Sequence, residues 1–212
     1  MQHARPLLRV VGYCGVAGAG KDTAAGHWAR CLGEWGIGWK RRALADALRE
    51  DVVALGLAAP GEVAPGVQRG YRVRRLLQVW GTEHGRALDP DYWLLRWSRY
   101  VLDLLAVTPT TPLVVLVPDV RFPNEAAFIL DELGGYLYMV EADERLAKSG
   151  MALRGPAARH PSEEGRAAIK RQFDHHPRFR AMGNNRSLDE YAAACREQAL
   201  AWARSEGLVV GK

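Results

Sequence analysis

The chain has 212 residues, of which 48% are hydrophobic and 25% charged, and its formal net charge is +5. These values are close to globular averages, so they exclude a disordered chain, a collagen-like rod and a coiled coil, and the length predicts one ordinary domain. The positive balance suits an anionic partner, either a nucleotide or a nucleic acid, without choosing between them.

The sequence features that bear on cellular location predict the cytoplasm. No apolar run reaches the roughly 18 residues of a membrane span, and no apolar segment opens the chain. We therefore expect neither a signal peptide nor a membrane partner. The cysteines, Cys14, Cys31 and Cys195, are far apart and form no CxxC pair, which fits a reducing compartment.

The first half of the chain predicts two strands and two helices before a loop. A short apolar run is followed by a glycine-rich turn and an amphipathic helix, whose apolar residues recur at spacings of four and three. The expected ranges are strands at 7–12 and 39–42, a first helix ending at 33–36, a second helix at 44–57, and a proline- and glycine-rich loop at 58–70.

The second half continues the alternation. The stretch at 149–165 has no period and predicts an irregular excursion, and Ser187 with Glu190 forms a capping-box signature. The expected ranges are helices at 73–80 (stopped by Gly81), 92–105, 123–133 and 187–205, and strands at 113–117 and 136–140. Strands alternating with helices predict a three-layer α/β domain with a mostly parallel central sheet.

Residues 15–23 read GVAGAGKDT and carry the clearest chemical signal. They match the phosphate-binding pattern GxxxxGK between an expected strand and an expected helix. The glycines let backbone N–H groups surround a phosphate, the helix dipole favours negative charge, and Lys21 can reach the β- and γ-phosphates of ATP. The predicted ATP-binding residues are Gly15, Ala17, Gly18, Ala19, Gly20, Lys21, Asp22 and Thr23.

The residue after the lysine is unusual, because Asp22 stands where serine or threonine is common. A carboxylate there can hold Mg²⁺ directly or through water, although it adds negative charge beside phosphate. The hydroxyl of Thr23 is the alternative ligand. Asp119, just after the strand at 113–117, is a third candidate for Mg²⁺, and its other interpretation is a cap for the helix at 123–133.

A small-molecule kinase is the class of P-loop protein that fits best. The guanine-recognition pattern NKxD is absent, and helicase cores need more chain. The irregular stretch at 149–165 predicts a lid that closes over the phosphates and excludes water. Arginines would capture phosphate oxygens and transition-state charge. The predicted catalytic residues are Lys21, Arg121, Arg154 and Arg159.

Several strings together resemble the deoxynucleoside monophosphate kinases of bacteriophages. Besides the P-loop, these are ADAL at 45–48, RLLQVWGTEHGR at 75–86, DYW at 91–93 and DVRFPNEA at 119–126. The resemblance runs from about residue 10 to residue 140, and GKD in place of GKS is itself a trait of that family. HPSE at 160–163 is similar but less specific, and the chain departs from the family's usual ADPLK with ADALR at 45–49.

The resemblance implies a P-loop fold of the nucleoside monophosphate kinase type over residues 1–212, with a helical monophosphate-binding region at 45–106 and a lid at 149–165. It implies transfer of the γ-phosphate of ATP, with Mg²⁺, to a deoxynucleoside 5′-monophosphate. Trp80 and Trp93 can stack on a base, and the alternative for both is core packing, which is favoured more for Trp80 than for Trp93. The implied acceptor site consists of Asp46, Arg75, Gln78, Gly81, Thr82, Arg86, Trp93 and Arg121.

Two other functions remain open at this point. A kinase for dephospho-coenzyme A or phosphomevalonate would share the loop and lid, but it would need neither the GTE at 81–83 nor the DVRFPNE at 119–125. A basic nucleic-acid-binding protein would leave the P-loop unexplained. For the kinase we expect no stable nucleic-acid complex, a cytoplasmic location (the host cytoplasm if phage-encoded) and, at the level of the family, a homodimer.

Overall fold

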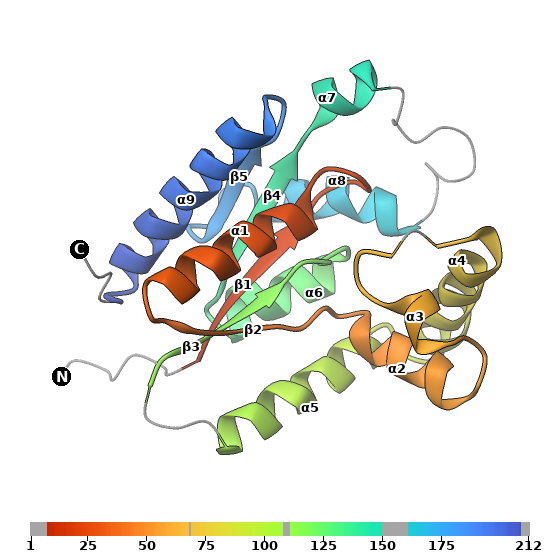
Figure 1. The fold of residues 1–212 in the computed structure, drawn as a ribbon. Helices are drawn as coiled ribbons and strands as arrows, with labels where there is room; N and C mark the ends of the chain where they lie inside the picture. Colours follow the sequence, from red (N-terminus) through yellow and green to blue (C-terminus); the bar gives the residue numbers. More distant parts are fainter. Residues whose placement is uncertain (1–7, 68, 108–110, 150–160, 209–212) are drawn as a thin grey trace. The chain divides into compact units, whose positions relative to one another are not determined.

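The computed structural model describes residues 8–67, 69–107, 111–149 and 161–208 (Figure 1). The chain divides into two compact units, each with its own core. Unit 1 comprises Met1–Arg42 and Pro109–Lys212, and unit 2, Ala43–Thr108, is inserted between these two parts. The helical region predicted at 45–106 falls inside unit 2.

Unit 1 is built on a five-stranded sheet whose strand order is β2-β3-β1-β4-β5, and every pairing is parallel. The carboxyl ends of its strands therefore share one edge, where open α/β sheets bind their ligands. The strands are β1 (Leu8–Cys14), β2 (Gly38–Arg41), β3 (Leu113–Val117), β4 (Tyr136–Glu141) and β5 (Phe179–Gly183). The sequence interpretation lacked β5.

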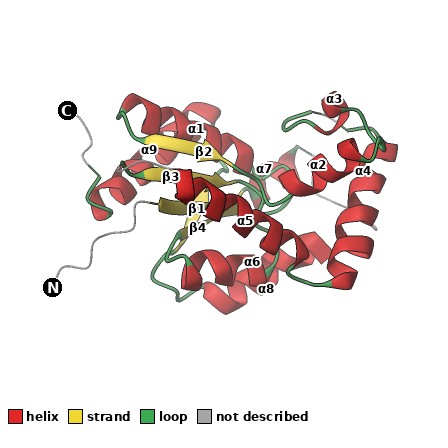
Figure 2. Cartoon of the chain, turned by 90° about the horizontal axis from the view of Figure 1, so that it is seen from below, coloured by secondary structure: helices red, strands yellow, loops and turns green. Residues whose placement is uncertain are grey.

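Helices cover both faces of this sheet (Figure 2). On one face lie α1 (Lys21–Glu34) and α9 (Leu188–Ser205), which pack against each other. On the other lie α6 (Pro123–Ala127), its continuation as the π-helix η2 (Phe128–Glu132), and α8 (Pro161–Phe173). A short helix, α7 (Asp143–Lys148), follows β4. The predicted three-layer α/β architecture is confirmed.

An aromatic cluster joins the sheet to its α1/α9 face. The Trp28 ring on α1 lies 4.9 Å from Tyr138, 5.4 Å from Trp202 and 6.0 Å from Tyr13, measured between ring centroids. All four side chains are buried, and aromatic pairs at such distances add about 0.5–1.5 kcal/mol each beyond the area they bury. The loop between β1 and α1 therefore begins and ends on rigid elements.

Unit 2 is helical and has a separate core made by Leu48, Val52, Val73 and Trp93. Its elements are α2 (Asp46–Ala54), α3 (Pro60–Val63), α4 (Tyr71–Gln78), the π-helix η1 (Val79–Arg86) and α5 (Tyr92–Val107). The short α3 lies in the stretch that the sequence predicted as a loop, with Pro60 at its first position, where proline costs no hydrogen bond.

The prediction that Gly81 ends a helix is wrong. The helix continues from α4 through Gly81 in the wider turns of η1, which ends at Arg86. Two glycines in η1 accommodate Trp93: its indole N–H donates to the Gly81 carbonyl at 2.7 Å, and a Cβ added to Gly85 would lie 2.6 Å from the indole nitrogen. Gly81 and Gly85 thus allow the Trp93 indole to pack closely against the helix, and Gly81 does not end it.

The end of the irregular stretch predicted at 149–165 is helical, because α8 begins at Pro161. Residues 150–160, including the predicted catalytic Arg154 and Arg159, lie outside the described residues. The predicted cap of the last helix is confirmed, since Ser187 Oγ accepts the Glu190 N–H and Glu190 Oε2 accepts the Ser187 N–H. Within the described ranges, no helix is long and apolar enough to cross a membrane.

Candidate functional site

The loop between β1 and α1 has the backbone of a phosphate cradle. Gly15, Gly18 and Gly20 have φ values of 139°, 77° and 103°, a region that residues with a Cβ rarely adopt. A Cβ at Gly15 would also lie 2.5 Å from the carbonyl oxygen of Val140. No side-chain hydrogen bond caps the start of α1 at Gly20, and the dipole of a helix favours an anion at its N-terminus.

Three side chains hold successive carbonyls of this loop. Arg145 Nη2 donates to Gly18 O at 2.8 Å, and Asn184 Nδ2 donates to Ala19 O at 2.7 Å. The Tyr191 hydroxyl donates to Gly20 O at 3.2 Å. These three bonds restrain the loop backbone, and within the loop the Ala19 N–H donates to the Val16 carbonyl at 3.1 Å.

The sequence interpretation missed this brace, because its members are far from the loop in the chain. Arg145 lies on α7, Asn184 follows β5, and Tyr191 lies on α9. Asn184 is itself fixed, since its N–H donates to the Glu141 carbonyl at 2.7 Å and its carbonyl accepts from Arg145 Nε at 3.0 Å. Only the fold brings these residues together.

Replacing Arg145 with alanine should weaken ATP binding about tenfold, or about 1.4 kcal/mol. The reason is the loss of the guanidinium bonds to Gly18 and Ala19 carbonyls, which leaves the loop less organised. Isothermal titration calorimetry measures the change. The control is Arg204→Ala, which removes an exposed arginine from α9; equal ATP affinity in the two variants would contradict the brace.

Lys21, the first residue of α1, carries a positive charge over the loop. Its Nζ donates to Gly15 O at 2.7 Å and to Val16 O at 2.8 Å. The buried Cys14 precedes the loop, and burial raises the pKa of its thiol to about 12 although Lys21 lowers it. The thiol is therefore neutral at physiological pH, and the charge beside the loop is that of the lysine.

The three predicted Mg²⁺ ligands are placed differently. The Asp22 carboxylate pairs with Arg41 at 2.6 Å, and Thr23 is exposed on α1. Asp119 is buried just beyond β3, where the next N–H, that of Val120, donates to Tyr13 O at 3.1 Å. Their oxygen donors suit Mg²⁺, which is usually held by one or two carboxylates together with substrate phosphates. No cluster of three or more His, Cys, Asp or Glu side chains able to hold a metal ion occurs in the described residues.

The loop after β3 is fixed by a buried carboxylate. Glu125, which is 2% exposed, accepts the N–H groups of Arg121 at 2.7 Å and Phe122 at 3.1 Å. On the other side Gly165 of α8 lies so close that an added Cβ would be 1.9 Å from Arg121 O. The Arg121 backbone is thereby held in place, while its side chain is exposed at the carboxyl edge of the sheet.

In unit 2, five of the predicted acceptor residues lie on α4 and η1. Arg75 Nη1 pairs with Glu83 Oε1 at 2.9 Å, both side chains being about half exposed, and Arg86 Nη1 donates to the Pro90 carbonyl at 2.9 Å. Gln78 and Thr82 are partly exposed on the same stretch. The wider turns of π-helices often occur at functional sites.

Asp46, also predicted at the acceptor site, starts α2. Its Oδ2 accepts the Ala43 N–H at 2.7 Å and its Oδ1 pairs with Arg49. In the structure this carboxylate therefore organises the start of its own helix.

The burial of Trp93 matches the alternative interpretation of this residue, which is core packing. Trp93 is 4% exposed, belongs to the unit 2 core and uses its N–H on Gly81. Trp80, for which core packing was the more favoured alternative, is only partly buried and stacks on His84 with 4.5 Å between ring centroids. The sequence feature that indicates the burial of Trp93 is the pair of glycines four residues apart, Gly81 and Gly85, because they leave room for the indole beside the helix.

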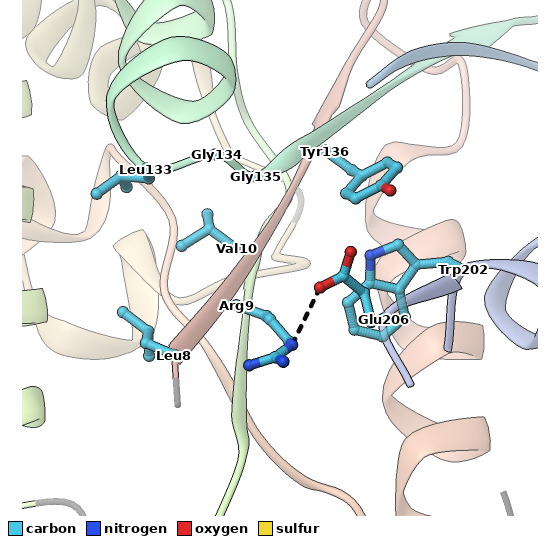
Figure 3. A pocket seen from close by; sticks show the side chains of 9 residues that line it. All are labelled: Leu8, Arg9, Val10, Leu133, Gly134, Gly135, Tyr136, Trp202 and Glu206. Atoms are coloured by element: carbon cyan, nitrogen blue, oxygen red, sulfur yellow. Dashed lines mark hydrogen bonds and ion pairs between the residues drawn. The ribbon is translucent and has the colours of Figure 1, made fainter. Parts of the chain in front are cut away.

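A pocket at the opposite end of the strands is not a candidate for phosphate (Figure 3). It lies at the start of β1 and β4 and is lined by Leu8, Tyr136 and Trp202, among others. Its arginine, Arg9, pairs with Glu206 at 3.1 Å, so the two charges largely neutralise each other.

Comparisons with known proteins agree with a P-loop kinase fold. No protein-family model matches the chain. It is 28% identical over 200 residues to a protein of Acanthamoeba polyphaga mimivirus named "Putative deoxynucleotide monophosphate kinase", covering 86% of this chain and 91% of that protein.

The chain is also similar to solved structures. Dephospho-CoA kinase from Campylobacter jejuni superimposes with a TM-score of 0.50 at 10% identity, covering 96% of this chain and 99% of that one. A gluconokinase from Sinorhizobium meliloti gives a TM-score of 0.49 at 14% identity, covering 93% and 94% of the two chains. At 10% identity the likeness to the dephospho-CoA kinase concerns the fold alone.

Proposed function

We propose that the protein is an ATP-dependent kinase that transfers the γ-phosphoryl group to a deoxynucleoside 5′-monophosphate. The observation that carries the kinase assignment is the braced glycine loop with Lys21 above it. The acceptor class rests on the name of the mimivirus relative and on the resemblance of residues 75–86 and 119–126 to the phage kinases.

The donor side of the reaction belongs to unit 1. The N–H groups of the loop and of the first turn of α1 would hold the β- and γ-phosphates, and Lys21 would neutralise the charge that develops on transfer. Asp22, Thr23 and Asp119 are the proposed Mg²⁺ ligands, and the ion would supply charge neutralisation between the phosphates. Arg154 and Arg159 remain predicted catalytic residues of the lid.

The acceptor needs positioning more than activation. A monophosphate oxygen is already anionic at pH 7, so no strong general base is required, and the work is charge neutralisation and in-line placement. Arg75, Arg86 and Arg121 are the proposed clamp. A guanidinium matches two phosphate oxygens at once, which an ammonium does not.

Replacing Arg75, Arg86 or Arg121 with alanine should raise KM for the monophosphate and lower kcat/KM at least about tenfold, or 1.4 kcal/mol. ATP affinity should stay within a few-fold, because the lost charge faces the acceptor. Steady-state kinetics with each nucleotide varied in turn measures both effects.

The control for this series is Arg99→Ala, which removes an exposed arginine of α5 that pairs with Asp103 four residues away. Equal losses of ATP and acceptor affinity in one variant would move that arginine to the donor side.

A coupled assay of ADP release tests the proposal as a whole. The acceptors to compare are the deoxynucleoside and nucleoside monophosphates, dephospho-coenzyme A and phosphomevalonate. ADP release that depends on a deoxynucleoside monophosphate supports the proposal. Turnover with dephospho-coenzyme A or phosphomevalonate alone would overturn the acceptor class, and release with none of them would overturn the kinase reaction.

A further inference from the structure

The carboxylate of Asp22 places a negative charge beside the expected phosphate site, which the P-loop pattern does not account for. It follows Lys21 directly, where the pattern places a neutral hydroxyl, and it lies in the first turn of α1. A carboxylate at this position adds negative charge next to the place where nucleotide phosphates would bind, and like charges at such distances repel. A cation must accompany it for nucleotide to bind well.

The chain supplies such a cation from a different strand. Arg41, the last residue of β2, donates through Nη2 to Asp22 Oδ1 at 2.6 Å. In the sheet β3 separates β2 from β1, so the contact crosses from an outer strand to the start of α1. Arg41 lies at the carboxyl edge of the sheet, the edge that carries the glycine loop.

The exposure of the pair indicates its role. The Asp22 side chain is 71% exposed and that of Arg41 28% exposed, and ion pairs open to water contribute little to stability. The contact is therefore poorly explained as a support of the fold. The carboxylate also remains accessible to a second cation.

We propose that Arg41 is the built-in counter-ion of Asp22 and that it competes with Mg²⁺ for this carboxylate. The inference rests on the proposed ATP-dependent function. When no metal is present, Arg41 neutralises Asp22 and allows ATP to bind. When Mg²⁺ arrives with the nucleotide, the metal takes over the neutralisation and the guanidinium becomes dispensable. Arg41 is thus a positioning residue that sets how strongly ATP binding depends on the metal.

The proposal predicts a change in one ratio, the Kd for ATP in EDTA divided by the Kd for ATP in Mg²⁺. Arg41→Ala should raise this ratio at least about tenfold, because metal-free ATP then meets an uncompensated carboxylate while binding with Mg²⁺ changes less than about threefold. Arg41→Lys, which keeps the charge, should give an intermediate ratio. Calorimetric titration of the intact protein with ATP measures each Kd.

A double-mutant cycle separates this role from a general effect of charge. In the Asp22→Asn background the carboxylate is gone, so adding Arg41→Ala should leave the ratio within about twofold. Asp22→Ser, which restores the common hydroxyl, provides a second background should the first variant fold poorly. Lys40→Ala is the matched control, since it removes a neighbouring exposed charge from the same strand, and it should not alter the ratio.

The outcomes are distinct. A ratio in Arg41→Ala equal to that of the wild type, or raised equally with and without Asp22, overturns the proposal. A fall in melting temperature without a change in the ratio would assign the pair to stability and also overturn it. If the wild-type protein binds ATP under neither condition, the proposed kinase function fails as well, so the two failures can be distinguished.

Discussion

Replacing Lys21 with methionine should lower kcat at least about a thousandfold, or about 4 kcal/mol, while the protein keeps its fold. The fold should persist because the Lys21 ammonium group donates to the Gly15 and Val16 carbonyls of the loop and does not belong to the core. Methionine has a similar length but no charge, so it cannot neutralise the transferring phosphoryl group. Steady-state turnover and thermal unfolding of the purified variant measure the two quantities.

Lys40→Met is the matched control, because it makes the same substitution at an exposed position of β2. Its kcat should stay close to that of the wild type. Should Lys21→Met retain more than about a tenth of the wild-type kcat, a loss below 1.4 kcal/mol, the assignment of residues 15–23 as the ATP phosphate loop is wrong.

Gly15→Ala should abolish most ATP binding, with Kd raised at least about a hundredfold, or about 2.8 kcal/mol. Two costs combine at this position. The φ of 139° is unfavourable for alanine, and its Cβ would lie 2.5 Å from the backbone oxygen of Val140, an atom of β4 that cannot move without the strand. The loop must shift, and its N–H groups then lose their common direction.

Gly26→Ala tests the same chemical change without those costs. Gly26 lies within α1, and a Cβ there meets no atom within 4 Å. Because alanine is the better helix former, this variant should be neutral or stabilised by up to about 1 kcal/mol. Wild-type ATP affinity in Gly15→Ala, measured by calorimetry, would mean that the loop is not the binding site.

The elements that could be predicted are those whose own residues carry the signal for their structure. The strand Leu113–Val117 was predicted with its observed bounds, because an uninterrupted β-branched and leucine run is typical of a central parallel strand. The capping box at Ser187 is equally local. By contrast β5 has the sequence FRAMG, exposed at three of its five residues, and only its pairing with β4 makes it a strand.

At the candidate site, the loop itself could be read from its glycines and lysine, but the residues around it could not. Arg145 and Arg41 act through contacts with residues that are not their neighbours in the chain, and nothing in the sequence around them distinguishes them from surface arginines. The choice between base stacking and core packing for Trp93 was left open for a related reason, since the burial of an indole depends on the helix that packs against it.

The insertion of unit 2 between β2 and β3 has a consequence for the order of folding. These strands pair directly, with Gly38 opposite Leu113, yet the whole of Ala43–Thr108 separates them in the chain. Joining the ends of a long flexible loop costs entropy that grows with its length. Helical units rich in local contacts fold fast, so unit 2, once folded, replaces a flexible loop by a compact spacer. Mutations that loosen the unit 2 core around Trp93 should therefore slow the completion of a sheet that they do not touch.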